Sequence, residues 1–366
     1  MTTPTFRCWA EISTSALRHN VRAVRERIGS AELLAVVKAN AYGHGMIGIA
    51  ETIGDDVDLF GVANLEEATA LRAAVSHPII ILGPALPQEV PEIAARQFIP
   101  TISSFEEAEQ FNHAAGSQKV PINFKVDTGM GRMGVLEADA IRVLQRIVKL
   151  SRLHIHSVST HLPVANEETE YTRDQLARFG ALLKNLREKV PGDYKAHVLQ
   201  SSGTLAFGDP VFDIVRAGVI LYGISPLPEY QSALRPVLTW KTRVGLVRDV
   251  PAGTSISYGR TFITPHPMRV GTITAGYADG YPRHLSNRDA NVLVRGQRCA
   301  LLGRVTMDLM VIDLSALPEV AAGEEVVLMG GQDGAEIPCS ELAELAGTIT
   351  WEIITRIGAR VRRVIV

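Results

Sequence analysis

Residues 31–45 of the chain, AELLAVVKANAYGHG, join a short apolar run ending in a lysine to a polar turn that contains two glycines. Short runs of the same apolar or β-branched type recur seven more times along the chain: DDVDLFGVA (55–63), HPIIIL (77–82), QFIPTI (97–102), VPINFKVD (120–127), RLHIHSVST (152–160), YKAHVL (194–199) and VFDIVRAGVI (211–220). Runs of this length, bounded by turn residues, predict about eight buried strands.

Between most of these runs lie stretches with helical spacing of apolar residues and charge on the other side: 64–75, 104–115, 135–150 and 167–188. The connection at 201–210, SSGTLAFGDP, can hold only a short helix. Strands that alternate with helices imply a parallel sheet covered by helices. Eight such units in about 190 residues suit a closed (β/α)₈ barrel of the TIM type better than an open sheet. A strand at FRCWAEIS (6–13) and a helix at 14–28, capped by Ser13 or Thr14, precede the repeat.

From about residue 234 the pattern changes to strand-like segments separated by glycine and proline turns, such as LTWKTRVGLVRDV (238–250), MRVGTITAGY (268–277) and EEVVLMG (324–330). This change predicts a second, mainly β domain, which ends in a helix at 340–346 and a strand at 360–366. The expected domains are therefore a barrel at 1–230 and a β domain at 231–366.

Composition excludes several classes of protein. The 366 residues carry 37 Lys and Arg against 39 Asp and Glu, a formal charge of −2, which argues against a nucleic-acid or anionic-membrane surface. No apolar stretch approaches the ~18 to 20 residues of a membrane-spanning helix. Cys8, Cys299 and Cys339 are too scattered for a disulfide framework or a zinc site, so no metal is expected. The N-terminus lacks the pattern of a secretory signal, and we expect a cytoplasmic protein.

The first candidate for chemistry is Lys38, which ends the apolar run at 31–37. Active sites of barrel enzymes lie at the carboxyl ends of the strands. An amine shielded from water has a lowered pKa, and only the neutral amine attacks an aldehyde, so a Schiff-base lysine fits this position. The alternative is a surface lysine whose stem lies along the rim of the barrel.

A glycine-rich segment, PINFKVDTGMGRMG at 121–134, contains a formal G-x-G-x-x-G pattern. A dinucleotide fingerprint also needs an acidic residue ~20 positions later, at the end of the next strand. That strand, at 152–160, has none, which disfavours the dinucleotide interpretation. What remains is a loop presenting Arg132, with Lys125 and Asp127 beside it. Arginine can bind a carboxylate through two hydrogen bonds, although a salt bridge at the rim is the alternative.

Histidines and the last two strand ends supply further candidates. His154 and His156 share one strand face without a carboxylate at ligand spacing, so they are interpreted as structural, whereas His161 follows the strand end. Ser201 and residues 216–219 fall near the ends of the seventh and eighth strands, where barrels commonly bind phosphate. A phosphate-bearing ligand and a Schiff-base lysine would then share one end of the barrel.

Together with SYGRTF (257–262), AGYADGYPR (275–283) and GRVTMDLM (303–310), these segments closely resemble the alanine racemases, pyridoxal-phosphate enzymes of fold type III. The resemblance covers essentially the whole chain, and several independent motifs occur in the family's order. It implies a racemase acting on L- and D-alanine that supplies D-alanine for cell-wall peptidoglycan.

The resemblance also implies a role for each matching residue. Lys38 would form the Schiff base with the cofactor, and Tyr258 would be the second catalytic base. Arg132 and the backbone N–H of Met307 would contact the substrate carboxylate. Lys125 matches a lysine that is often carbamylated in the family, and the resulting anion could orient Arg132.

The remaining implied contacts concern the cofactor and the assembly. The phosphate would be held by Tyr42, Ser201, Gly218 and Val219. Arg216 would face the pyridine nitrogen with His161 behind it. In the family, the residues matching Tyr258 and Met307 reach the active site of the neighbouring subunit, which implies a head-to-tail homodimer with shared sites.

The chemistry requires such a set, because inversion at Cα needs one group to remove a proton from one face and another to supply a proton on the opposite face. By resemblance, Lys38 acts on the D-isomer and Tyr258 on the L-isomer.

Three alternatives stay open. Ala359 stands where many members have a tyrosine near the cofactor phosphate, which leaves a broad-specificity or serine racemase possible. A decarboxylase of the same fold is disfavoured because Thr306 stands where its motif has a cysteine. A non-catalytic pyridoxal-phosphate carrier is disfavoured because such proteins are typically barrel-only.

Overall fold

The structure is a computed structural model that describes residues 6–190, 192–207 and 212–366. Val211, where the eighth strand was expected to begin, and the last three residues of the expected 201–210 connection lie outside these ranges. The chain divides into two compact units, one made of 17–41 and 46–235 and the other of residues up to Ala16, 42–45 and 236–366. We call them the barrel unit and the β unit.

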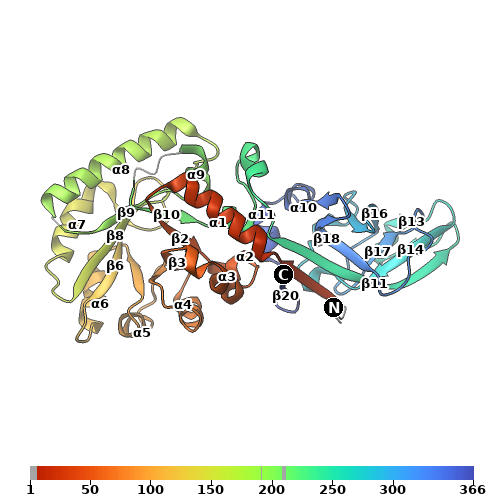
Figure 1. The fold of residues 1–366 in the computed structure, drawn as a ribbon, viewed down its shortest axis with the longest axis horizontal. Coiled ribbons are helices and arrows are strands. Elements are labelled where there is room, and N and C mark those ends of the chain that lie inside the picture. Colours follow the sequence, from red (N-terminus) through yellow and green to blue (C-terminus); the bar gives the residue numbers. More distant parts are fainter. Residues whose placement is uncertain (1–5, 191, 208–211) are drawn as a thin grey trace. The chain divides into compact units, whose positions relative to one another are not determined.

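Eight parallel strands close the barrel of the barrel unit (Figure 1). They are β2 (Glu32–Val36), β3 (Leu59–Val62), β4 (Ile79–Ile81), β5 (Ile99–Ile102), β6 (Val120–Asp127), β8 (Leu153–Ser159), β9 (Lys195–His197) and β10 (Ile214–Ala217). Each pairs with the next, and β10 pairs back with β2, with Ala217 opposite Ala35. The prediction of a (β/α)₈ barrel is confirmed.

The unbroken apolar character of these strands follows from burial on both faces. Every residue of β3, β4 and β5 is buried, as expected for parallel strands that have side chains inside the barrel and helices outside. Phe60 and Phe124 are completely buried. Each such side chain contributes about 1.5 to 3 kcal/mol relative to an exposed one.

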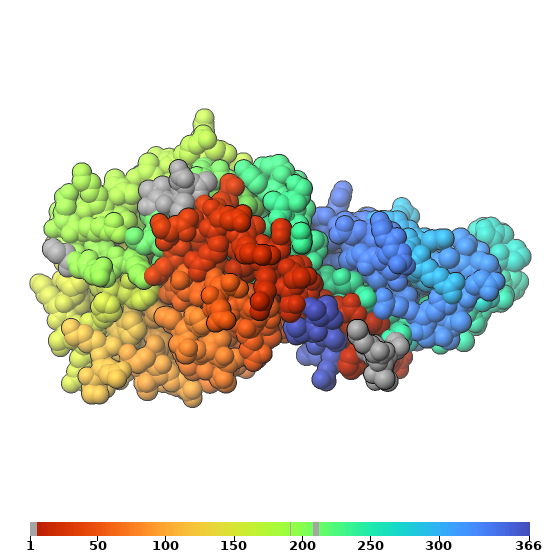
Figure 2. Space-filling model, in the orientation of Figure 1, coloured from red at the N-terminus to blue at the C-terminus, as the bar shows by residue number. Residues whose placement is uncertain are grey.

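The helices of this unit follow the strands, and Figure 2 shows the side chains of the longest one (yellow-green) on the outer surface of the unit. They are α3 (Met46–Ile53), α4 (Leu65–Arg72), α5 (Val90–Ala95), α6 (Phe105–Ala114), α7 (Ala140–Ile147), α8 (Thr169–Lys189) and α9 (Ser201–Phe207), with α1 (Thr14–Ile28) before the barrel. Asn64 and Ser104 cap α4 and α6 by accepting hydrogen bonds from the N–H groups of Glu67 and Glu107. The helix expected at 135–150 is shorter, because β7 (Val135–Leu136) and a 3₁₀ turn precede α7.

The β unit contains a ring of six strands in the order β11, β14, β17, β16, β15 and β18, which pairs back with β11. Its elements are β1 (Cys8–Ile12), β11 (Leu238–Val250), β12 (Ser255–Ile256), β13 (Phe262–Ile263), β14 (Met268–Ile273), β15 (Asn291–Val294), β16 (Gln297–Leu302), β17 (Met310–Asp313), β18 (Glu325–Gln332), β19 (Ala335–Ile337), α10 (Cys339–Ala346), α11 (Thr350–Thr355) and β20 (Arg362–Ile365). The prediction of a mainly β second domain is confirmed.

The N-terminal strand is part of the β unit, whereas the sequence pattern had grouped residues 1–230 with the barrel. β1 runs antiparallel to β11, with Cys8 opposite Thr242, and parallel to β20. These partners are more than two hundred residues away, so local spacing gives no sign of the pairing. No helix in the described part of the chain is long and apolar enough to cross a membrane.

Candidate active site

Lys38 follows Val37, the first residue after β2, at the carboxyl end of the barrel strands, as predicted. Burial, and then the positive charge of Arg132, lower the pKa of its amine, while Glu67 opposes this shift. The Glu67 carboxylate accepts hydrogen bonds from the N–H groups of Ala39 (2.7 Å) and Ala63 (2.8 Å), the residues that follow Lys38 and the end of β3. One carboxylate therefore fixes the backbone beside the lysine.

The four residues after Lys38 form a left-handed turn. Ala39, Asn40, Ala41 and Tyr42 have φ angles of 52° to 54°, although none of them is glycine. This conformation costs about 1 to 2 kcal/mol per residue. Hydrogen bonds offset part of the cost, among them Ala41 N–H to the Val37 carbonyl (2.7 Å) and Met46 N–H to Asn40 Oδ1 (2.8 Å). Burial raises the pKa of the Tyr42 hydroxyl to about 12.

The glycine-rich loop after β6 is organised by Asp127. Its carboxylate accepts hydrogen bonds from the N–H groups of Gly129, Met130 and Gly131 at 2.9 to 3.2 Å. Partial burial would raise the pKa of Asp127, but these N–H donors lower it, so the carboxylate stays charged. The loop presents Arg132, whose exposed guanidinium has no hydrogen-bond or ion-pair partner among the described residues.

Arg216 lies in β10 and is almost completely buried, with four hydrogen bonds to its guanidinium. It donates to the carbonyls of Thr160 (3.0 Å) and Val198 (2.8 Å) and contacts Nδ1 of His197 (2.7 Å) and of His161 (3.2 Å). Burial, and then the charge of Arg132, lower the pKa of Arg216 to about 10, which leaves it protonated at neutral pH. A buried charge of this kind is tolerated only when its donors are satisfied.

The histidines around Arg216 are neutral. Burial, and then Arg216, lower the pKa of His161 to about 2, and the same two causes hold the pKa of His197 well below its usual range. Because Asn123 Oδ1 can only accept, His197 Nε2 donates to it (3.1 Å), and His197 Nδ1 accepts from Arg216.

His197 was not identified from the sequence. In the sequence it is marked only as a polar residue in a buried strand, and this feature does not distinguish a histidine of a functional site from a structural one. His154 is exposed, while His156 contacts the Ser157 hydroxyl at 3.2 Å.

Four basic side chains, those of Lys38, Lys125, Arg132 and Arg216, lie near one another at this end of the barrel, together with the carboxylates of Glu67 and Asp127. Burial, and then Arg216 and Arg132, hold the pKa of the Lys125 amine well below its usual range. Lys38 has the same two arginines as neighbours. The donors here are suited to an anionic ligand, and a cofactor carrying an aldehyde and a phosphate fits the residues present.

The candidate phosphate residues lie at the ends of β9 and β10. Ser201 begins α9, and its Oγ accepts a hydrogen bond from the Gly218 N–H (3.0 Å). Val219 follows in a buried 3₁₀ turn. Ser201, Gly218 and Val219 are thus brought together in the fold.

Tyr258 and Met307 lie on exposed turns of the β unit. Their side chains are 72% and 54% exposed, respectively. The turn that carries Tyr258 contains two non-glycine residues with left-handed φ angles, Ser257 (62°) and Arg260 (50°). Ser257 Oγ donates to the Arg304 carbonyl (2.6 Å), which joins this turn to the 303–310 segment. Both side chains are therefore accessible to another molecule.

A closed (β/α)₈ barrel that places a lysine of lowered pKa near Arg132 and the buried Arg216, at the carboxyl ends of its strands, is typical of a barrel enzyme. Family models described as the alanine racemase N-terminal and C-terminal domains match residues 12–226 and 237–365. The chain therefore belongs to the alanine racemase family, whose members are isomerases.

Individual relatives are similar over nearly their whole length. An alanine racemase of Methylacidiphilum infernorum is 40% identical over 365 residues, which cover 98% of this chain and 92% of that protein. The alanine racemase structure from Bacillus anthracis with bound L-Ala-P has a TM-score of 0.91 and 34% identity, and the match covers 100% of this chain and 96% of that one. The structure from Bartonella henselae with covalently bound pyridoxal phosphate has a TM-score of 0.87 and 29% identity, covering 99% and 100%.

Gly134 closes the glycine-rich loop at a φ of +118°, where a Cβ atom would lie 2.7 Å from Asp127 N and 2.8 Å from the Val126 carbonyl carbon. We predict that Gly134→Ala lowers the free energy of unfolding by about 2 kcal/mol or more, because backbone must move to relieve the contact. Gly180→Ala in α8 is the control, since nothing lies within 4 Å of its Cβ position, and it should stabilise by about 0.5 to 1 kcal/mol. Urea unfolding measures both, and equal effects would refute this view of the loop.

Proposed function

We propose that this chain catalyses the interconversion of L- and D-alanine with pyridoxal 5'-phosphate as cofactor, and that the D-isomer serves cell-wall peptidoglycan. The observation that carries the proposal is Lys38, whose amine has a lowered pKa at the carboxyl end of β2, near Arg132 and Arg216. The names of the relatives, and the covalently bound pyridoxal phosphate of the Bartonella henselae protein, support the same reaction.

Pyridoxal phosphate, when bound, supplies the electron-withdrawing system that makes the Cα proton of an amino acid removable. The residues that would hold it are Lys38, Tyr42, His161, Ser201, Arg216, Gly218 and Val219. Lys38 would attach it covalently, because a neutral amine is the form that reacts with an aldehyde. Arg216 would face the ring nitrogen. It keeps its own protons at neutral pH and so leaves that nitrogen unprotonated, which limits side reactions such as transamination.

The substrate carboxylate would be bound by two groups. The Arg132 guanidinium has donors free within the described residues and can offer two parallel hydrogen bonds to a carboxylate. The backbone N–H of Met307 would supply a further bond. Charge-assisted bonds of this kind fix the direction in which Cα presents its proton.

Inversion of Cα would be performed by Lys38 Nζ and Tyr258 Oη acting on opposite faces. Lys38 would remove the proton from D-alanine, and Tyr258 would remove it from L-alanine. In each direction the other group donates a proton to the opposite face. A single base would return the proton to the face from which it came.

Tyr258 and Met307 would serve the active site of a second copy of the chain in a head-to-tail homodimer. The exposure of these two side chains, 72% and 54%, supports this assignment, because a partner subunit would cover them.

Lys125 would carry a carbamate. Burial, and then the neighbouring arginines, lower the pKa of its amine, which favours the neutral form. The neutral amine would attack carbon dioxide, forming an N–C bond and releasing one proton. The new negative charge would lie among Arg132 and Arg216 and would help to orient Arg132.

The cofactor assignment is tested by Lys38→Ala, which should abolish the absorbance of the protein-bound cofactor near the visible edge because this change removes the amine that would attach it. Lys195→Ala is the control, since Lys195 is paired with Glu32 at the start of β2, at the opposite ends of the strands. If both Lys38→Ala and Lys195→Ala keep this absorbance, the cofactor is not attached to Lys38.

The two-base assignment is tested by Tyr258→Phe in deuterium oxide. Complete inversion needs both groups and should fall alike in both directions, so exchange of the Cα proton is the informative quantity. NMR should show that exchange from L-alanine falls by about 10² to 10⁴-fold, the usual value of a positioned base, while D-alanine keeps exchanging through Lys38. Equal losses of exchange from the two isomers would sink the assignment.

The shared site is tested by mixing inactive Lys38→Ala and Tyr258→Phe subunits under conditions that allow exchange. Each heterodimer should contain one intact site, so a random mixture should recover about a quarter of the normal activity. The activity of the mixed sample, compared with that of either variant alone, measures this. No recovery, despite heterodimers detected by a tag on one subunit, would argue against a site built from two copies.

A further inference from the structure

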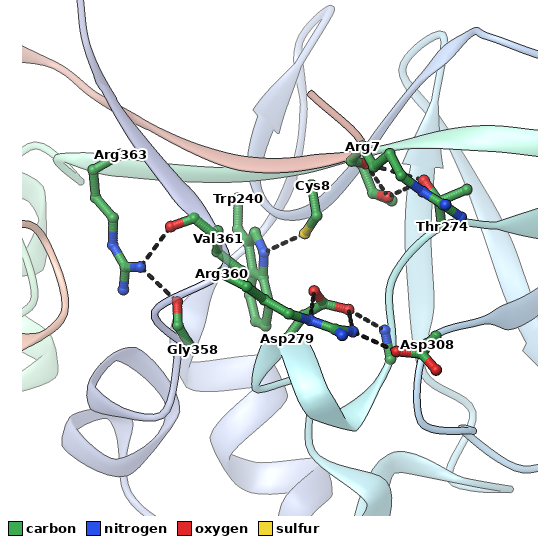
Figure 3. A network of polar contacts seen from close by, with 12 residues as sticks. Arg7, Cys8, Trp240, Thr274, Asp279, Asp308, Gly358, Arg360, Val361 and Arg363 are labelled. Carbon is green, nitrogen blue, oxygen red and sulfur yellow. Dashed lines mark hydrogen bonds and ion pairs between the residues drawn. The ribbon is translucent and has the colours of Figure 1, made fainter. Parts of the chain in front are cut away.

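Arg360 joins two turns of the β unit through its guanidinium, as Figure 3 shows. Nε and Nη2 donate to the two carboxylate oxygens of Asp279 at 2.7 and 3.0 Å, and Nη2 also donates to Asp308 at 2.8 Å. Asp279 lies in the turn after β14, whereas Asp308 directly follows Met307. One side chain near the C-terminus thus links the two turns.

The Asp279 side chain is only 6% exposed, which separates this pair from an ordinary surface salt bridge. Its carboxylate also accepts the Gly276 N–H at 2.8 Å, and its backbone carbonyl accepts the Gly358 N–H at 2.8 Å. A carboxylate this deeply buried requires a paired cation. Arg360 supplies it with the bidentate geometry that a lysine cannot reproduce.

The turn that contains Asp279 is bonded directly to the backbone around Met307. Tyr277 N–H donates to the Thr306 carbonyl, and Ala278 N–H donates to the Met307 carbonyl, both at 3.0 Å. The turns are in such close contact that a Cβ atom at Gly276 would lie 2.3 Å from the Thr306 oxygen.

The bond to Thr306 fixes the Met307 N–H. The Thr306 carbonyl and the Met307 N–H belong to one planar, trans peptide unit and point in opposite directions. Once the carbonyl is bonded to Tyr277, the direction of the N–H is set. Within residues 6–190, 192–207 and 212–366, no group accepts a hydrogen bond from this N–H.

We propose that Arg360 is a positioning residue that, through Asp279 and Asp308, holds the Met307 N–H in the direction from which it donates to the substrate carboxylate. This rests on the proposed function, in which Met307 binds that carboxylate. Arg360 itself acts through the two turns and has no role in proton transfer. Since the bond is present before and during the reaction, its loss weakens binding more than turnover.

The test compares Arg360→Lys with Arg298→Lys. Arg298 lies in the same unit and also makes three hydrogen bonds, two of them to Glu341, but none to either turn. Arg360→Lys should raise KM for both L- and D-alanine about tenfold, the usual value of a bond to a charged group, with kcat changed less than threefold. Inhibition by acetate, a carboxylate without an amine, should weaken in the same proportion. Arg298→Lys should leave all three quantities unchanged.

Hydrogen exchange of the intact protein tests, independently of activity, whether Arg360 holds the two turns together through Asp279 and Asp308. We call this linkage the clamp. The amides of Tyr277 and Ala278 should exchange about tenfold faster in Arg360→Lys. Asp308→Asn, which keeps the buried Asp279 pair and so preserves folding, should give a smaller change of the same sign in KM and exchange.

If the amides of Tyr277 and Ala278 exchange at the same rate in Arg360→Lys as in the unmodified protein, Arg360 does not hold the two turns. If they exchange faster but KM is unchanged, the clamp does not affect binding of the substrate carboxylate. If KM rises as much in Arg298→Lys as in Arg360→Lys, the effect of Arg360 is a general structural one and is not specific to the two turns. If the unmodified protein does not racemise alanine, the proposed function fails, and the exchange data still decide whether Arg360 holds the two turns.

Discussion

The hydrogen bonds that satisfy Arg216 inside the barrel are the interaction on which the rest of the site depends. A buried guanidinium is costly unless its charge and donors are compensated, and Thr160, Val198, His161 and His197 accept hydrogen bonds from its two terminal nitrogens. After burial, this cation contributes to the lowered pKa of His161 and His197, and also to that of Lys125 and of Lys38. The chemistry available to Lys38 is therefore set partly by a residue on another strand.

In each unit, an aspartate carboxylate holds the backbone of a turn through hydrogen bonds. In the barrel unit, the Asp127 carboxylate accepts three backbone N–H groups of the loop that presents Arg132. In the β unit, Asp279 closes a turn that is bonded to the backbone around Met307. In both cases the carboxylate lies on a different residue from the group that the turn presents, Arg132 or the Met307 N–H. It restricts the conformations of that turn before any ligand binds, which lowers the entropy cost of binding.

Much of this arrangement could be predicted from the sequence, because the barrel depends on repeated local patterns. Eight apolar runs with intervening helices predicted the closed sheet, and the strand ends predicted where Lys38, Arg132 and Arg216 would lie. The pairing of β1 with β11 could not be predicted, since it joins residues far apart in sequence. His197 and Arg360 were also missed. Their importance lies in contacts with Arg216 and Asp279, and neither residue carries a local motif that records such a contact.

The central proposal is that the chain inverts the Cα centre of alanine. Chiral chromatography of L-alanine, L-serine and L-lysine, each incubated with the protein and pyridoxal 5'-phosphate, tests it most directly. We predict that D-alanine accumulates until both isomers are equal, because enantiomers have the same free energy in water, and that serine and lysine convert more slowly. Faster inversion of serine would favour the broad-specificity or serine racemase. Absence of D-alanine, or formation of a decarboxylated amine, would contradict the account.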